Sequence, residues 1–251
     1  MPRIVNEVEY AEKRNEILDV AQRLIYSEGY QQMTIQEILD ALQISKGAFY
    51  HYFSSKQALL EAMIERMMAD IEQVLDPIVL DPDLPALEKL QTFFSSISQF
   101  KTARKDYLLA LLRAWYADDN AILRQKVETN LLDQAALLLA EIIQQGIREG
   151  AFTNPFPDQV AEVVMVLLQS MSEAVARLIL APEPDQHSLD EIENSVAAYT
   201  DAIERVLGMP SGSLEFFDSQ TLKKWVDLPA EEAVPIGETP VQMPVKKEQT
   251  L

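Results

Sequence analysis

The residues of this chain best suited to chemistry lie in one segment, Ile44 to Lys56, with the sequence ISKGAFYHYFSSK. Two lysines, a histidine and several aromatic side chains occur there without a single acid, although 21 basic and 40 acidic residues give the whole chain a net charge of −19. From Ala41 to Leu60 the local charge is +2, from two lysines and no acids. Cationic and hydrogen-bonding side chains on an acid-free surface are typical of contacts with a phosphate backbone. The segment therefore indicates nucleic-acid binding.

Other kinds of chemistry find no support in the sequence. The chain has no cysteine, and its two histidines, His51 and His187, are far apart, so a thiolate zinc site or a cysteine nucleophile is excluded. It has no nucleophile elbow, phosphate-binding glycine loop, dinucleotide fingerprint or paired catalytic carboxylates. We therefore predict no catalytic residue, no metal ligand and no cofactor. An N-terminus without an apolar signal core, and apolar tracts too short for a bilayer, lead us to expect a cytoplasmic protein without a membrane partner.

Apolar residues recur at three- and four-residue steps, and prolines separate long intervals that lack them. This pattern predicts an all-α chain with helices over residues 10–28, 34–41, 45–52, 55–76, 85–100, 105–117, 120–149, 157–180 and 188–207. We divide the chain into an N-terminal arm (1–9), a unit with two short helices (10–56), a larger helical unit (57–207) and a C-terminal extension (208–251). In the extension, LEFFDSQTLKKWV is apolar enough to dock as a short helix, and the proline-rich remainder is typical of disorder.

The second and third predicted helices are short and separated by a tight turn. Thr34 suits the N-cap of the second, with Glu37 completing a capping box, and Ser45 suits the N-cap of the third. Two short helices around a tight corner outline a helix-turn-helix, although corners of this kind also occur in proteins that do not bind DNA. The outline alone therefore does not establish DNA binding.

The third helix favours DNA. Phe49 and Phe53, four residues apart, share one face that suits anchoring in the core, while Gly47, Ala48 and His51 lie on the opposite arc. Glycine inside a helix costs about 1 kcal/mol relative to alanine, and close approach of another molecule would explain it. Small residues on this arc would let the helix enter a major groove. A purely structural aromatic segment would explain the two phenylalanines but not the glycine or the missing acids.

Residues 13–56, KRNEILDVAQRLIYSEGYQQMTIQEILDALQISKGAFYHYFSSK, followed by QALLEAMIERM, closely resemble the DNA-binding domain of TetR-family (tetracycline-repressor-like) transcriptional regulators. The resemblance implies that Tyr52 and Lys56 bind backbone phosphates and that Thr34 touches a phosphate at the start of the second helix. It also implies that the groove is faced by Ser45, Lys46, Gly47, Ala48, Tyr50 and His51. Gln43 departs from the family by standing where glycine is usual, which requires a positive φ that glutamine tolerates at a cost on the order of 1 kcal/mol. Leu39 and Leu42 stand where the family often has alanine.

The resemblance implies that residues 10–56 are a helix-turn-helix DNA-binding domain and that residues 57–207 are a helical effector-binding and dimerisation domain. The helix over 157–180 is apolar around most of its circumference and the helix over 188–207 along one stripe, which fits a four-helix interface between two copies, or a central helix in a monomer. The predicted interface residues are Val164, Leu168, Met171, Val175, Ile192, Val196, Tyr199 and Ile203. The candidates for an apolar effector pocket are Met63, Met67, Phe94, Ile97, Phe100, Arg113, Trp115, Tyr116 and Leu139, each of which is also plausible as ordinary core.

The sequence therefore favours a sequence-specific, DNA-binding transcriptional regulator. Its expected partners are a palindromic double-stranded operator, a second copy of itself and a small-molecule effector, and repression is the expected mode of action. The alternative is a helical protein-binding adaptor, whose association with duplex DNA should show neither steep salt dependence nor sequence preference.

Overall fold

A computed structural model describes residues 7–181, 186–217 and 219–226. The described chain is helical throughout and contains no strand, which confirms the predicted all-α class. The helices are α1 (Glu7–Glu28), α2 (Ile35–Leu42), α3 (Lys46–Tyr52), α4 (Lys56–Leu80), α5 (Ala86–Ala103), α6 (Lys105–Trp115), the 3-10 turn η1 (Asp118–Asn120), α7 (Ala121–Glu149), α8 (Val160–Ile179), α9 (Gln186–Leu207) and α10 (Ser219–Val226). None of the described helices is long and apolar enough to cross a membrane.

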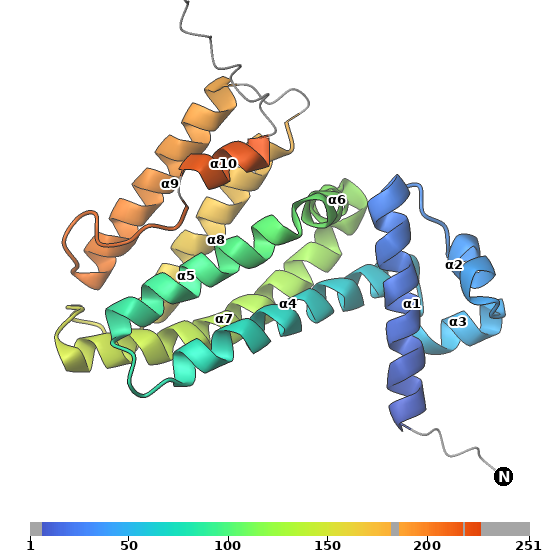
Figure 1. Cartoon of the computed structure of the whole chain (residues 1–251), viewed down its shortest axis with the longest axis horizontal. Helices are drawn as coiled ribbons and strands as arrows, with labels where there is room; N and C mark the ends of the chain where they lie inside the picture. The colour runs from blue at the N-terminus through green and yellow to red at the C-terminus, as the bar shows by residue number, and fades with distance from the viewer. Residues whose placement is uncertain (1–6, 182–185, 218, 227–251) are drawn as a thin grey trace, which may run out of the picture.

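The first three helices form a head at one end of the molecule, and α4 leads from it into a larger body made of the later helices (Figure 1). Helix α1 begins at Glu7, so it takes in part of the segment that was predicted to be an N-terminal arm. The rest of that arm, residues 1–6, and the predicted disordered end, residues 227–251, lie outside the described residues.

Helix α4 runs to Leu80, past the proline at which the sequence predicted its end. Proline removes one backbone donor, which leaves the carbonyl of residue 73 without its usual partner. Both Gln73 and Pro77 are exposed, so water can meet that carbonyl. At the end of the helix the ammonium of the buried Lys89 donates to the carbonyl oxygen of Val79 at 2.6 Å. The proline therefore removes one helical hydrogen bond only on the solvent-exposed side of α4, where water can replace it.

The apolar residues form two cores that meet along α4. The head core contains α1 to α3 and the first turns of α4, and also Tyr107, Leu111 and Ala114 of α6 and Val127 of α7. The body core contains the rest of α4 with α5 and α7 to α10. Helix α6 therefore packs with the head, although it lies some fifty residues further along the chain than the predicted end of the DNA-binding domain at residue 56.

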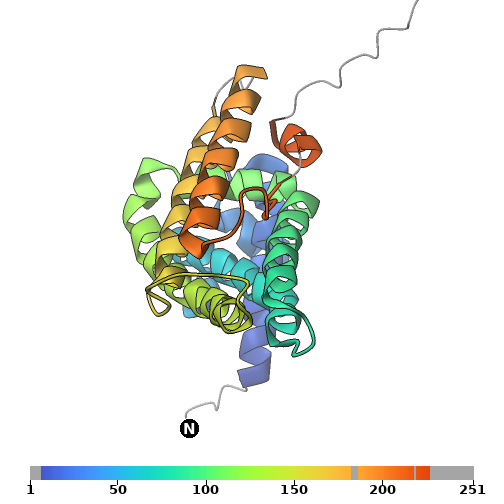
Figure 2. The same ribbon diagram turned by 90° about the vertical axis from the view of Figure 1, so that its left-hand side faces the viewer.

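The described part of the C-terminal extension folds back across the body, and the segment expected to dock as a short helix contains α10. We call residues 209–217 together with α10 the strap. The buried carboxylate of Glu204 accepts hydrogen bonds from the backbone N–H groups of Gly212 (2.9 Å) and Leu214 (2.7 Å), which fixes the first loop of the strap. Leu222, Trp225 and Val226 then bury the inner face of α10. Figure 2 shows α10 beside the α8–α9 pair, on the side of α5.

Candidate nucleic-acid interface

The turn between α2 and α3 has the geometry that the sequence predicted. Gln43 ends α2 with φ of 52°, in the left-handed region, which confirms that glutamine takes the conformation for which glycine is more common. Its neighbour Ile44 donates its N–H to the carbonyl of Leu39 at 3.1 Å. Ser45 then caps α3 by accepting a hydrogen bond from the N–H of Ala48 at 3.1 Å. These local bonds set the direction in which α3 leaves the turn.

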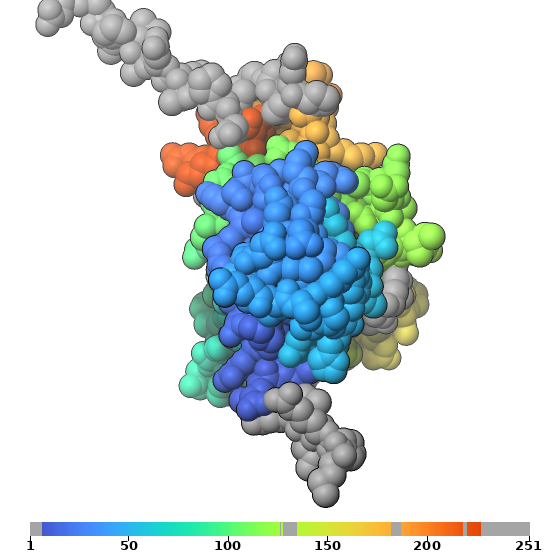
Figure 3. Space-filling model, turned by 90° about the vertical axis from the view of Figure 1, so that its right-hand side faces the viewer, coloured from blue at the N-terminus to red at the C-terminus, as the bar shows by residue number. Residues whose placement is uncertain are grey.

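Two phenylalanines anchor α3 to the head. Phe49 and Phe53 are 0% and 2% exposed, and their ring centroids lie 5.9 Å apart. The other side of the helix is open to solvent at Lys46, Gly47 and His51. Figure 3 shows this end of the molecule, where the side chains of α2 and α3 form a continuous protruding surface. The predicted groove-facing arc is therefore accessible along its length.

Packing within the chain does not require glycine at position 47. A Cβ placed there would meet only the hydroxyl oxygen of Ser45, at 3.9 Å, which is ordinary van der Waals distance. The backbone at this position has helical dihedrals that any residue adopts. Since glycine nevertheless costs about 1 kcal/mol in a helix interior, its presence favours a constraint from outside the protein. Close approach of a duplex to α3 supplies such a constraint.

Thr34 lies at the exposed N-terminus of α2, and its side chain takes part in the predicted capping box. The hydroxyl accepts from the N–H of Glu37 at 3.2 Å and donates to that residue's carboxylate at 2.7 Å. Hydrogen bonds from the Thr34 hydroxyl, followed by its backbone N–H, lower the pKa of Glu37. A phosphate at this position would therefore compete with Glu37 for the donors of Thr34.

Lys56 occupies a different environment from the exposed phosphate-binding position that the resemblance implies. Its ammonium donates to the carbonyl oxygens of Met33 (2.6 Å) and Gln31 (3.2 Å) and lies 4.5 Å from the ring centroid of Tyr30. Burial lowers the pKa of Lys56, and the carboxylate of Glu37 partly opposes that shift. Since a lysine has three N–H donors, only one is left for a phosphate. The main contacts of Lys56 fix the loop between α1 and α2.

Tyr10, near the start of α1, completes an aromatic cluster that the sequence did not predict. Its ring centroid lies 5.6 Å from that of His51, in an edge-on arrangement, and 4.8 Å from that of Tyr52. The centroids of His51 and Tyr52 lie 5.1 Å apart. Tyr10 therefore limits the positions of two side chains expected to touch DNA. No motif or spacing pointed to this contact, because Tyr10 and His51 are far apart along the chain.

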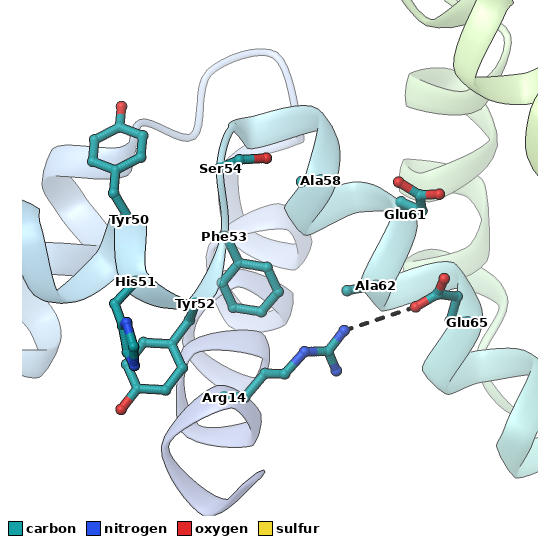
Figure 4. A pocket seen from close by; sticks show the side chains of 10 residues that line it. All are labelled: Arg14, Tyr50, His51, Tyr52, Phe53, Ser54, Ala58, Glu61, Ala62 and Glu65. Carbon is teal, nitrogen blue, oxygen red and sulfur yellow. Dashed lines mark ion pairs between the residues drawn. The ribbon is translucent and has the colours of Figure 1, made fainter. Parts of the chain in front are cut away.

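A hollow of about 450 Å³ lies behind the C-terminal end of α3, between α1 and α4 (Figure 4). Arg14 projects into it from α1, with its guanidinium 5.2 Å from the ring centroid of Phe53 and 3.7 Å from the carboxylate of Glu65. Glu61 and Glu65 line its α4 side. These acids would repel a phosphate, so the hollow marks a boundary of the surface that DNA can cover.

The structure does not bring the predicted effector residues together. Met63 lies in the head core with Trp115 packed against it, whereas Phe94, Phe100 and Leu139 lie in the body core. Met67 touches both cores, and Ile97 packs on the body core. Arg113 is exposed, and Tyr116 lies beside Arg124, whose guanidinium is 5.2 Å from its ring centroid. One pocket containing all nine residues is therefore not present in this conformation.

Most of the predicted interface residues are covered by the chain itself. Val164, Met171, Ile192, Val196 and Ile203 are buried in the body core of one chain. Leu168, Val175 and Tyr199 are half-buried against the same core. The apolar residues of α8 that face outward are instead Val163 and Val166, which are 45% and 57% exposed.

Comparisons with known proteins agree with this geometry. Residues 17–63 match the family described as bacterial regulatory proteins, tetR family. The HTH-type transcriptional repressor NemR of Escherichia coli is 25% identical over 188 residues, covering 73% of this chain and 94% of NemR. An HTH-type transcriptional regulator of Bacillus subtilis, YerO, is 32% identical over 140 residues, covering 51% of this chain and 47% of YerO. The repressor DhaR of a Mycobacterium species is 25% identical over 84 residues, so the chain spans under half of both DhaR and YerO.

Solved structures share the fold. A TetR-family regulator from Pectobacterium atrosepticum superposes with a TM-score of 0.60 at 18% identity, covering 81% of this chain and 98% of that one. A transcriptional regulator from Cytophaga hutchinsonii gives 0.58 at 21% identity, covering 84% and 97%. These likenesses confirm the fold, with an N-terminal helix-turn-helix head on a helical body.

Removing the charge of Lys46 should affect duplex binding, whereas removing that of Lys56 should mainly affect stability. We expect Lys46→Ala to leave the melting temperature unchanged and to flatten the dependence of log Kd on log salt by about one unit per protomer, because it removes one phosphate contact. Lys56→Ala should lower the free energy of unfolding by about 1 kcal/mol, because two carbonyl oxygens lose their donor. Duplex titrations between low and moderate salt, together with thermal melts, measure both. If Lys56→Ala leaves the stability unchanged but flattens the salt dependence of duplex binding, the main contact of Lys56 is with a phosphate.

Tyr10 should affect selectivity for an operator through its ring. Tyr10→Ala should lower the ratio of specific to non-specific affinity roughly 2- to 10-fold, since aromatic pairs contribute about 0.5–1.5 kcal/mol. Tyr10→Phe keeps the ring and should restore the ratio. Tyr26→Ala removes an exposed tyrosine from the far end of α1 and is the matched control. Equal ratios for wild type and Tyr10→Ala would show that the cluster does not position the reading side chains.

Proposed function

Since this chain belongs to the TetR family of bacterial regulatory proteins, we propose that it is a dimeric, ligand-responsive transcriptional regulator that reads a palindromic operator through α3. The observation that carries the proposal is the surface of α3, where an exposed, acid-free arc opposes two buried phenylalanines. It includes a glycine that internal packing does not require. We assign no catalytic step to the protein, and its place of action is the cytoplasm, where its operator lies.

Different residues of the head contact the bases and the phosphate backbone of DNA. Small side chains at Gly47 and Ala48 let the helix enter the major groove, where base edges differ in their donors and acceptors. Tyr50 and His51 offer hydroxyl and imidazole groups to base edges or phosphates. Lys46 lies beside the Tyr50 ring, 5.9 Å from its centroid, at the end of α3 that is free to meet phosphate. A patch of this size binds weakly on its own, so two heads are needed for tight binding.

A second copy would pair through the outer face of α8 and α9. Val163 and Val166 lie exposed on α8, and α9 runs alongside it with small, exposed Ala197 and Ala198. Two such pairs form a four-helix interface in which the small residues permit close packing. The resulting two-fold symmetry places two α3 helices against one duplex and requires an inverted repeat.

Among the described helices, α4 and α7 contribute to both cores, and α4 leads directly from the head into the body, so a change in the body can reach the head through α4. The side chain of Gln57, at its first turn, also donates to the carbonyl oxygen of Asp119 at 3.2 Å, which ties the start of α4 to η1. An effector that prefers one position of these helices would shift the spacing of the two heads, and repression would end when that spacing no longer fits the operator.

The proposal predicts that selection from a random duplex pool recovers an inverted repeat. Gly47→Leu should then lose at least roughly tenfold in operator affinity, because its side chain fills the space needed by the groove. The same variant should keep or gain stability by up to about 1 kcal/mol, since leucine is the better helix former. Electrophoretic shifts and denaturant unfolding measure the two effects. A pool without enrichment, or an unaffected Gly47→Leu protein, would contradict the placement of the groove face.

The interface proposed on the outer face of α8 predicts a dimer in solution. Val166→Glu places a charge in the proposed interface and should turn a dimer into a monomer in sedimentation experiments, with a large loss of operator affinity. Ile122→Glu is the matched control, because Ile122 is 86% exposed and lies outside α8 and α9. A dimer that survives Val166→Glu would place the interface elsewhere.

A further inference from the structure

The strap covers one face of α5 over about three turns. The side chain of Gln91 donates to the carbonyl oxygen of Ser213 at 3.0 Å. One turn further, the ring centroids of Phe94 and Phe216 lie 4.2 Å apart. Near the end of the helix, the indole N–H of Trp225 donates to the hydroxyl of Thr102 at 3.3 Å. Because positions 91, 94, 98 and 102 share one face of a helix, these contacts define a continuous seam between α5 and the strap.

Ser98 and Lys101 lie on this seam between Phe94 and Thr102, and the fold makes no use of their polar atoms. Within the described residues, neither side chain has a hydrogen bond or an ion pair. Ser98 is only 8% exposed and Lys101 is partly buried. No fully covered side-chain N or O atom in the described chain lacks a partner, so the hydroxyl and the ammonium must both reach open space. The seam is therefore not completely closed at these two residues.

The surroundings of Lys101 are unusual for a lysine. Burial lowers its pKa, with no neighbouring carboxylate to oppose the shift. Glu204, the one buried acid among the described residues, already accepts hydrogen bonds from Gly212 and Leu214. An ammonium that is partly withdrawn from water and has no counter-charge loses hydration free energy, and an incoming anion would offset that loss.

We propose that the seam between α5 and the strap binds an organic carboxylate with an apolar or aromatic body. The Lys101 ammonium and the Ser98 hydroxyl hold the carboxylate. The body of the ligand packs on the rings of Phe94, Phe216 and Trp225, which are 7%, 5% and 9% exposed and must move apart to admit it. Polar groups at one end of an apolar site are the usual arrangement for such ligands. This assignment rests on the proposed function in one respect only, which is that the ligand would be the effector.

A ligand bound at this seam would lie next to the corner between α5 and α6. Lys101 and Thr102 lie in the last turn of α5, only a few residues before α6 begins at Lys105. Helix α6 packs in the head core through Tyr107 and Leu111. A ligand that changes how the strap sits on the end of α5 therefore acts next to the helix that contacts the reading head.

The test is calorimetric titration of the full chain with 3-phenylpropionate and, separately, with its neutral counterpart 3-phenylpropanamide. The wild-type protein should bind the carboxylate at least roughly tenfold more tightly than the amide, the preference expected from a charge-assisted hydrogen bond. Lys101→Met should abolish this preference, and Ser98→Ala should reduce it. Lys224→Met removes an exposed lysine of α10 and should leave the preference intact.

Equal affinity of the wild-type protein for the two compounds, absence of carboxylate binding, or a full preference in a folded Lys101→Met protein would overturn the proposal. Operator titrations of the same variants separate this result from the proposed function. Lys101→Met should bind duplex as the wild type does, because Lys101 lies outside the head. If no variant binds duplex but the carboxylate preference persists, the regulator assignment fails and the anion site stands.

Discussion

The burial of Phe49 and Phe53 under α3 is the constraint on which the reading surface depends. A helix of seven residues has too few internal hydrogen bonds to be stable alone, so its orientation must come from packing. The two rings fill the head core, and the cap at Ser45 fixes the start of the helix. Because both anchors lie on one face, Lys46, Gly47, Tyr50 and His51 are left exposed for a partner. Loss of either ring would free the whole surface.

That anchoring extends beyond the three helices of the head. Arg66 of α4 donates to Asp19 and Gln22 of α1, both at 2.6 Å, and so holds α1 across α4. Helix α6 adds Tyr107 and Leu111 to the same core. Burial raises the pKa of Tyr107 to about 12, which reflects how fully α6 is enclosed there. In packing terms the head therefore extends beyond α1 to α3 to include parts of α4, α6 and α7, and a movement of α6 must either carry the head with it or open a cavity.

The sequence predicted those features that are set by neighbouring residues. The capping box of Thr34 and Glu37, the cap at Ser45, the left-handed Gln43 and most helix boundaries depend on local hydrogen bonds and periodicity, and all are confirmed. The sequence did not show which of several surfaces an apolar residue faces. Helical spacing placed Val164 and Ile203 on an apolar stripe, but only the three-dimensional packing shows that α8 and α9 use that stripe on their own core. The internal contacts of Lys56 could not be predicted for the same reason, since its partners at Gln31 and Met33 lie more than twenty residues away.

The distribution of charge on the head limits the orientations in which the protein can bind a duplex. Apart from the acid-free stretch around α3, acids surround the head, from Glu7, Glu9 and Glu12 on α1 to Glu61 and Glu65 on α4. At moderate salt, charges act over about 8–10 Å, so these acids repel any approach other than one led by α3. The net charge of −19 thus weakens non-specific binding and favours the single orientation in which Lys46 and the tyrosines meet phosphate. An acidic protein that binds DNA in this way gains selectivity from repulsion as well as from contact, and it needs both heads of a dimer to compensate for the lost attraction.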